Sequence, residues 1–112
     1  MTRSNVKQFA RILNFTGKLT DNPVTGISTD TRTIQPNQAF FAIKGENFDG
    51  HDYIDKAINK KASCIISQNG TAKKYKSENI ITVTDTTEAL GQIAKHQRKV
   101  SGYKLIAITL KV

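Results

Sequence analysis

The sequence contains a single cysteine, Cys64, among its 112 residues. One cysteine cannot form an internal disulfide and has no second thiol with which to share a metal ion. Its position before the apolar Ile65 favours a buried structural thiol. The two histidines, His51 and His96, are too far apart in the sequence for the spacing of a zinc site. We therefore expect neither a disulfide nor a structural metal ion.

Long apolar segments are also missing. No apolar run approaches the roughly 20 residues that a membrane-spanning helix requires, and residues 1–14 lack the apolar stretch of a secretory signal. The composition, 38% hydrophobic and 23% charged, is typical of a soluble globular protein. A chain of this length can bury one packed core. These features predict a protein without a membrane span and with a cytoplasmic location.

Acidic residues are scarce: nine Asp and Glu stand against 17 Lys and Arg, for a formal net charge of +8. Such an excess favours anionic partners, which include nucleic acid, an acidic surface and a phosphorylated small molecule. The lysines are scattered along the chain and do not form one dense tract interleaved with aromatics, which favours solvated helix faces and loops. A basic nucleic-acid-binding module remains an alternative that rests on charge alone.

Apolar spacing predicts an alternation of helices and strands. Residues 6–13 have helical spacing, with Ser4 available as the N-cap. Residues 39–43 are apolar without alternation, which is typical of a strand covered on both faces in a parallel α/β sheet, and residues 63–67 predict the next strand. Residues 52–61 have helical spacing between them. This order predicts a strand–helix–strand crossover unit.

The second half of the sequence repeats this pattern. Residues 80–83 predict another strand, and Asp85 with Glu88 forms an acidic variant of a capping box that opens a helix. That helix is expected to end near Ser101. Residues 104–109 predict a last buried strand.

Turn residues interrupt the segment between the first helix and the first polar motif. Residues 15–26 contain Gly17, Pro23 and Gly26, which predicts a short strand between turns. Residues 25–29 are a candidate partner for that strand. The predicted fold class is α/β, with a small mixed or parallel sheet and flanking helices.

The first polar motif, STDTR, precedes the apolar run at 39–43. Threonine hydroxyls both donate and accept hydrogen bonds, so Thr29 and Thr31 suit a base edge such as uracil. The planar guanidinium of Arg32 suits a phosphate or a carboxylate. Equally, an ion pair between Asp30 and Arg32 can close a turn while hydroxyls cap backbone groups. The spacing alone leaves both interpretations open.

The second polar motif, KGENFDGH, begins at Lys44, directly after the same apolar run. Loops at the carboxyl ends of parallel strands commonly hold ligands in α/β domains. Gly45 and Gly50 allow the backbone to approach a ligand closely. Asn47 offers an amide, and Phe48 can cover a flat ring. The motif therefore predicts a ligand-binding loop.

A purely structural interpretation also fits the end of this motif. Asp49 or His51 can simply cap the following helix. If His51 lay near a diphosphate, it could donate a hydrogen bond, and the negative charge would favour its protonated form. His96, on a helix rich in Lys and Arg, is interpreted as solvated.

Together, the run from STDTR through AFFAIKGENFDGHDYIDKAINKKASCII resembles the N-terminal domain of the Mur ligases, ATP-dependent amide ligases of peptidoglycan synthesis. The similarity extends from about residue 25 to residue 109. The version KGENFDGHDYI is most similar to the ligases that join D-alanyl-D-alanine to UDP-N-acetylmuramoyl-tripeptide. The ligases that add the third amino acid to UDP-N-acetylmuramoyl-dipeptide are the alternative.

The resemblance implies that both polar motifs bind the UDP moiety of UDP-N-acetylmuramoyl-peptide. It implies that Thr29 and Thr31 lie against the uracil and that the second loop adds contacts to the nucleotide. No catalytic residue and no metal ligand is expected within the chain. The expected substrate-binding residues are Thr29, Asp30, Thr31, Arg32, Gly45, Asn47, Phe48, Asp49 and His51.

In the family, a strand like LIAIT runs into a glycine-rich phosphate loop that ends in Gly-Lys-Thr and binds ATP. Here that strand is followed by Leu110, Lys111 and Val112. We therefore expect residues 1–103 to form the substrate-binding domain and residues 104–112 the first strand of a truncated ATP-binding domain. The chain alone is expected to be inactive and without cofactor. The full-length enzyme would use ATP, magnesium and D-alanyl-D-alanine through its other domains.

Overall fold

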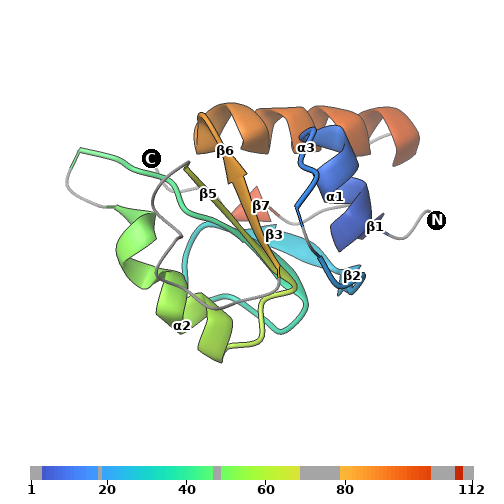
Figure 1. The fold of residues 1–112 in the computed structure, drawn as a ribbon. Coiled ribbons are helices and arrows are strands. Elements are labelled where there is room, and N and C mark those ends of the chain that lie inside the picture. Colours follow the sequence, from blue (N-terminus) through green and yellow to red (C-terminus); the bar gives the residue numbers. More distant parts are fainter. Residues whose placement is uncertain (1–3, 18, 47–48, 69–78, 102–107, 110–112) are drawn as a thin grey trace.

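A computed structural model of the chain describes residues 4–17, 19–46, 49–68, 79–101 and 108–109 (Figure 1). These residues form short strands and helices. They are β1 (Ser4–Asn5), α1 (Val6–Ile12), β2 (Pro23–Val24), β3 (Gly26–Ser28), β4 (Gln38–Phe41), the 3₁₀ helix η1 (Gly50–Tyr53), α2 (Ile54–Asn59), β5 (Cys64–Gln68), β6 (Ile80–Val83), α3 (Thr86–Ser101) and β7 (Ile108–Thr109). An α-helix lies between β4 and β5 and another between β6 and β7.

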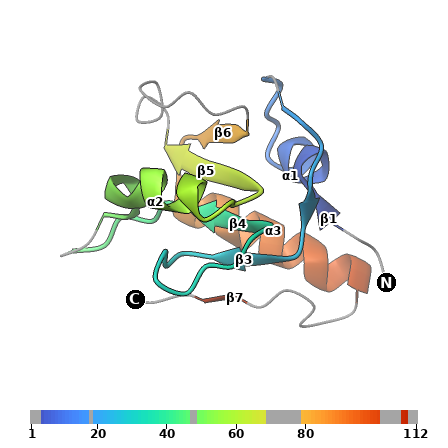
Figure 2. The same ribbon diagram turned by 90° about the horizontal axis from the view of Figure 1, so that it is seen from below.

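Five of the strands form one sheet in the order β6-β5-β4-β3-β7, and Figure 2 shows them one after another. Every neighbouring pair in this sheet is parallel. The winding direction reverses at β3, where Ile27 lies opposite Ala39 of β4 on one side and Ile108 of β7 on the other. β1 and β2 form a separate antiparallel pair.

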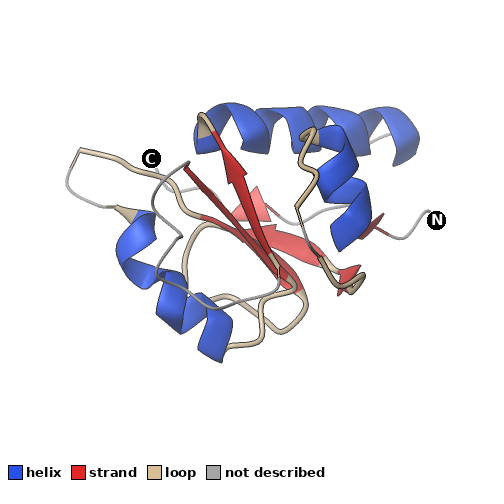
Figure 3. Ribbon diagram, viewed as in Figure 1, coloured by secondary structure: helices blue, strands red, loops and turns tan. Residues whose placement is uncertain are grey.

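The sheet is covered on both faces, with α1 and α3 on one side and α2 on the other (Figure 3). Alternate residues of each central strand supply the two cores, because successive side chains point to opposite faces. Ala39 and Phe41 pack in the core that contains α1 and α3, whereas Phe40 packs in the core that contains α2. Ile66 and Ile65 divide in the same way. The α/β fold class is therefore confirmed.

Most of the predicted elements lie within two residues of their predicted positions. β6 has the predicted bounds, β5 is shifted by one residue, and β4 begins one residue earlier and ends at Phe41. The helix predicted over 52–61 divides into η1 and α2, and Asn59 is its last residue. The tighter first turn begins at Gly50, which lies close to the backbone at Ile43.

Two predictions near the N-terminus are wrong. Asn5 caps α1, since its side chain accepts a hydrogen bond from the Gln8 N–H at 2.8 Å, and Ser4 instead pairs with Val24. The strand at residues 25–29 was expected to pair with the preceding short strand. Instead β3 lies between β4 and β7, because its three residues are all buried and need a partner strand on each side.

The cap of α3 has the predicted form. The Asp85 carboxylate accepts hydrogen bonds from the backbone N–H of Thr87 at 2.9 Å and of Glu88 at 3.1 Å, and the helix ends at Ser101. Of the last predicted strand, β7 contains Ile108–Thr109, and residues 104–107 lie outside the described residues. The domain boundary at residue 103 stays a prediction. No helix in the described ranges is long and apolar enough to cross a membrane.

Candidate functional site

The two polar motifs follow neighbouring parallel strands. Residues 29–32 follow β3 and residues 44–51 follow β4, so both begin at the carboxyl edge of the sheet. β3 is also the strand at which the winding direction reverses. In open α/β sheets, the crevice outside the carboxyl ends at such a switch point is the common ligand site.

The loop after β3 is organised around Asp30. The Ser28 hydroxyl accepts a hydrogen bond from the Asp30 N–H at 3.1 Å and donates to the Asp30 carbonyl at 3.0 Å. The Asp30 carboxylate accepts from the Arg32 N–H at 2.8 Å, and the guanidinium of Arg32 adds Nε and Nη2 contacts. The turn-closing interpretation of the Asp30–Arg32 pair is therefore confirmed.

The ion pair between Asp30 and Arg32 leaves the guanidinium of Arg32 at the surface. The Arg32 side chain is 76% exposed and that of Asp30 only 10%. The hydrogen bond to Asp30, and next its negative charge, raise the pKa of Arg32, so the guanidinium stays charged. Within the described part of the chain, Nη1 of Arg32 makes no hydrogen bond, which leaves donors for an anion.

Both threonines of the motif are nearly buried, each with 6% exposure. The carbonyl of Thr31 accepts a hydrogen bond from Lys60 Nζ at 2.7 Å, which ties the loop to the end of α2. The hydroxyl of Thr31 has no hydrogen bond to any residue that the structure describes. Its donor and acceptor are therefore both available to a ligand.

The loop after β4 is closed at its base by a bridge between Lys44 and Asp49. Next to this bridge, the Gly50 N–H donates to the carbonyl of Ile43 at 2.8 Å. The Asp49 side chain caps η1 by accepting from the His51 N–H at 3.0 Å. The capping interpretation is thus confirmed for Asp49.

His51 connects this loop to the next strand. Its Nδ1 lies 2.7 Å from Asp49 Oδ1, and its Nε2 accepts the backbone N–H of Gln68, the last residue of β5, at 3.0 Å. Burial acts to raise the pKa of Asp49, but hydrogen bonds from the His51 backbone and ring, together with the positive charge of Lys44, outweigh it. The net effect lowers the pKa of Asp49.

The remaining predicted residues are less informative. Gly45 is exposed, and Asn47 and Phe48 lie outside the described residues. His96 is partly exposed on α3, in keeping with its interpretation as a solvated residue. In the described ranges, no group of three or more His, Cys, Asp or Glu side chains could hold a metal ion.

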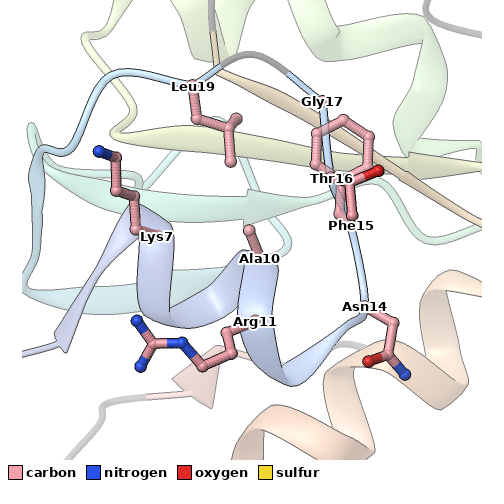
Figure 4. Close-up of a pocket in the computed structure, with 8 residues that line it drawn as sticks. All are labelled: Lys7, Ala10, Arg11, Asn14, Phe15, Thr16, Gly17 and Leu19. Atoms are coloured by element: carbon pink, nitrogen blue, oxygen red, sulfur yellow. The ribbon is translucent and has the colours of Figure 1, made fainter.

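Two surface hollows lie away from the predicted residues. The larger, of about 600 Å³, lies beside α1, and Figure 4 shows Lys7 and Arg11 on the helix with Phe15 and Leu19 on the segment that follows. Its lining residues are Lys7, Ala10, Arg11, Asn14, Phe15, Thr16, Gly17 and Leu19. Its side chains come from a helix end and an irregular segment, for which the sequence carries no distinct motif.

The smaller hollow, of about 300 Å³, lies where β6 ends, between α1 and α3. Polar residues directly after an apolar strand are the signal here. In the sequence, Asp85 and Glu88 predict only a helix cap. The lining residues are Leu13, Asn14, Thr82, Val83, Thr84, Asp85, Glu88, Ala89 and Gln92.

An open parallel sheet with helices on both faces and polar loops at its carboxyl edge is the α/β architecture in which ligands commonly bind at that edge. Residues 23–98 match the family model described as "Mur ligase family, catalytic domain". The chain therefore belongs to the Mur ligase family, as the sequence motifs indicate.

Two kinds of ligase are among the relatives. The chain is 29% identical over 112 residues to the UDP-N-acetylmuramoyl-tripeptide–D-alanyl-D-alanine ligase of Bacillus subtilis, covering 97% of this chain and 24% of that protein. It is 38% identical over 71 residues to the UDP-N-acetylmuramoyl-L-alanyl-D-glutamate–2,6-diaminopimelate ligase of Phocaeicola vulgatus, covering 63% of this chain and 15% of that protein. The chain thus spans a quarter or less of the length of these relatives.

A solved structure supports the same fold. The crystal structure of MurF from Acinetobacter baumannii matches 89% of this chain and 22% of that chain, with a TM-score of 0.70 and 22% sequence identity. At this identity, the likeness shows the fold alone.

Proposed function

We propose that the chain is the substrate-recognition domain of an ATP-dependent amide ligase of peptidoglycan synthesis and binds the UDP moiety of UDP-N-acetylmuramoyl-peptide. The observation that carries this proposal is the position of residues 29–32. They lie at the carboxyl end of β3, the switch point of the sheet, beside the loop that follows β4. Family membership supports the same ligand class.

In this proposal, different residues of the first motif contact different parts of the substrate. The hydroxyl of Thr31, with Thr29 beside it, supplies donors and acceptors for the uracil edge. The exposed guanidinium of Arg32 binds a phosphate oxygen, while Asp30 holds it in place. The positive net charge favours an anionic substrate in general.

The second loop completes the proposed site. Asn47 and Phe48 are proposed to contact the nucleotide, and Gly45 allows the backbone to approach it. Asp49 and His51 shape the end of this loop through their mutual hydrogen bonds.

Addition of D-alanyl-D-alanine to the tripeptide is the proposed reaction of the full-length enzyme, because the similarity to the Bacillus subtilis ligase covers 97% of the chain. Addition of the third amino acid is the alternative, since ligases of that kind also match. ATP, magnesium and D-alanyl-D-alanine would bind through parts of the enzyme other than the residues described above. The proposal also places the protein in the cytoplasm.

A titration of the chain tests the proposal. We expect UDP-N-acetylmuramoyl-tripeptide to bind and Thr31→Ala to weaken binding by about tenfold, the value of one good hydrogen bond. The melting temperature should change little. Thr87→Ala, which truncates an exposed threonine on α3, is the matched control. Tight, salt-sensitive binding of an RNA oligonucleotide without any response to the UDP-sugar would overturn the proposal in favour of nucleic-acid binding.

A further inference from the structure

Both ring nitrogens of His51 have a hydrogen-bond partner. Nδ1 lies 2.7 Å from the Asp49 carboxylate, and Nε2 lies 3.0 Å from the backbone nitrogen of Gln68. The side chain is only 10% exposed. The ring therefore lies in a fixed orientation between the loop after β4 and the carboxyl end of β5.

These partners determine where the proton lies. A backbone N–H can only donate, so Nε2 must offer its lone pair to Gln68. The carboxylate of Asp49 can only accept, so Nδ1 must carry the proton. The neutral ring with its proton on Nδ1 satisfies both partners, whereas a doubly protonated ring would set an N–H against the N–H of Gln68.

The hydrogen bonds of His51 lie where the loop after β4 ends. Gly50 lies against the backbone of Ile43, and Asp49 is the partner of Lys44 across the base of the loop. The bond from His51 to Gln68 adds a third attachment, to a different strand. It is a direct hydrogen bond from the turn after the loop to the end of β5, in addition to the backbone contacts with residues 42–44.

We propose that His51 is a positioning residue: its neutral, Nδ1-protonated ring fastens the end of the substrate loop to β5 and does not itself contact the substrate. This inference rests on the proposed function for the identity of the substrate, and it assigns His51 a different role from the diphosphate donor considered above. Nε2 carries no proton in this arrangement, so it has none to give to a phosphate oxygen.

Charged and polar groups from two elements face the ring. Asp49 contacts Nδ1 directly, Lys44 lies across the bridge from Asp49, and Asp52 is the next residue in η1. From β5, the contacting group is the backbone amide of Gln68, which donates to Nε2.

Two substitutions separate the two hydrogen bonds. In His51→Asn the side-chain amide can stand in for Nδ1 and donate to Asp49, but nothing reaches Gln68. In His51→Gln the longer side chain can place its oxygen near the position of Nε2 and accept from Gln68. His96→Gln, at a partly exposed position on α3, is the matched control.

The first experiment uses the ligand-free chain. Nitrogen-15 NMR of the His51 ring at neutral pH should show a proton on Nδ1 and none on Nε2. Amide hydrogen exchange of Gln68 should be about five- to tenfold faster in His51→Asn, and closer to the original rate in His51→Gln. A ring protonated on Nε2, or equal Gln68 exchange in His51→Asn and the unsubstituted chain, would overturn the inference.

The second experiment tests whether the hydrogen bond between His51 and Gln68 affects affinity for the substrate. Affinity for UDP-N-acetylmuramoyl-tripeptide should be lower in His51→Asn than in the unsubstituted chain and closer to the original value in His51→Gln. Rescue of affinity in His51→Gln relative to His51→Asn supports positioning, and equal loss in both variants contradicts it. If the unsubstituted chain binds no UDP-sugar while the NMR result holds, the proposed function fails and the fastening of the loop stands.

Discussion

Gly50 and Ile43 approach each other so closely that a side chain between them is excluded. The Gly50 N–H donates to the Ile43 carbonyl at 2.8 Å, and a Cβ on Gly50 would lie 2.8 Å from the Ile43 nitrogen and 3.0 Å from Cα of Ala42. These neighbours are backbone atoms of β4 and its continuation, so they cannot rotate away. The close approach fixes where the loop after β4 ends.

Gly50→Ala should therefore lower the free energy of unfolding by about 1–3 kcal/mol, the usual cost of an added methyl group in a filled space. Urea unfolding followed by circular dichroism measures this change. The control is Gly91→Ala on α3, where an added Cβ meets no atom within 4 Å. That substitution should stabilise the chain by about 0.5–1 kcal/mol, because alanine favours the helix. If Gly50→Ala and Gly91→Ala changed the free energy of unfolding by the same amount, the packing argument would be contradicted.

The Asp30–Arg32 pair should respond unequally to truncation of its two partners. Asp30→Ala removes a nearly buried acceptor of backbone and side-chain hydrogen bonds, which we expect to cost about 1–3 kcal/mol. Arg32→Ala removes an exposed side chain and should change stability by less than about 0.5 kcal/mol. Thermal melts of both variants make the comparison. A larger loss in Arg32→Ala would mean that the ion pair, and not the turn, holds the loop.

In substrate binding the order should reverse, with Arg32→Ala weakening affinity more than Asp30→Ala does. Arg32→Ala removes the proposed phosphate-binding guanidinium, so it should weaken affinity for UDP-N-acetylmuramoyl-tripeptide by about tenfold or more, since a charged hydrogen bond is lost. Arg32→Lys keeps the charge but loses the planar fork, and should recover only part of the affinity. Calorimetric titration checks this series. Unchanged affinity in Arg32→Ala would remove Arg32 from the proposed site.

Sequence pattern predicted the elements that depend on local residues. The apolar run of β6 is bounded by turn-forming residues, and the Asp85 cap is a local motif, so both lie as predicted. The partners of β3 were missed, because β7 lies about 80 residues further along the chain and no local pattern encodes that pairing. The N-cap predicted at Ser4 is wrong for a related reason, since the pairing of Ser4 with Val24 is non-local.

In the candidate site, too, local features could be predicted from the sequence and non-local contacts could not. The position of the second polar motif at the carboxyl edge followed from its place directly after the apolar run at 39–43. The first motif was described only by its place before that run, and its position at the same edge depends on the non-local pairing of β3. Whether Asp30 pairs with Arg32 was left open, since spacing cannot distinguish a closed turn from a free guanidinium. The bond between His51 and Gln68 depends on the register of β4 against β5 and had no signal in the sequence.

Acid should weaken the loop through Asp49. Its pKa lies below the ordinary value of 3.8, so the ionised carboxylate stabilises the fold above that pH, and this stabilisation is lost as pH falls through the lower folded-state value. Asp49→Asn should therefore be less stable than the unsubstituted chain at neutral pH, with the difference shrinking below about pH 4. Urea unfolding across this pH range tests the expectation, with the exposed Asp52→Asn as control. A pH-independent difference would refute it.

Cys64 should be chemically inert in the folded chain. It is 1% exposed in β5 and packs in the core that contains α1 and α3, and burial raises the pKa of its thiol to about 12. Because the thiolate is the reactive form, a disulfide reagent at mildly alkaline pH should react on the order of a thousandfold more slowly than with an ordinary thiol. The same chain in urea is the control and should react at the normal rate. Rapid labelling of the folded chain would contradict this expectation, because it would show that β5 opens readily. In that case Cys64→Ser would change the free energy of unfolding little. We expect instead that Cys64→Ser, which buries a hydroxyl among apolar side chains, lowers the free energy of unfolding by about 1–3 kcal/mol.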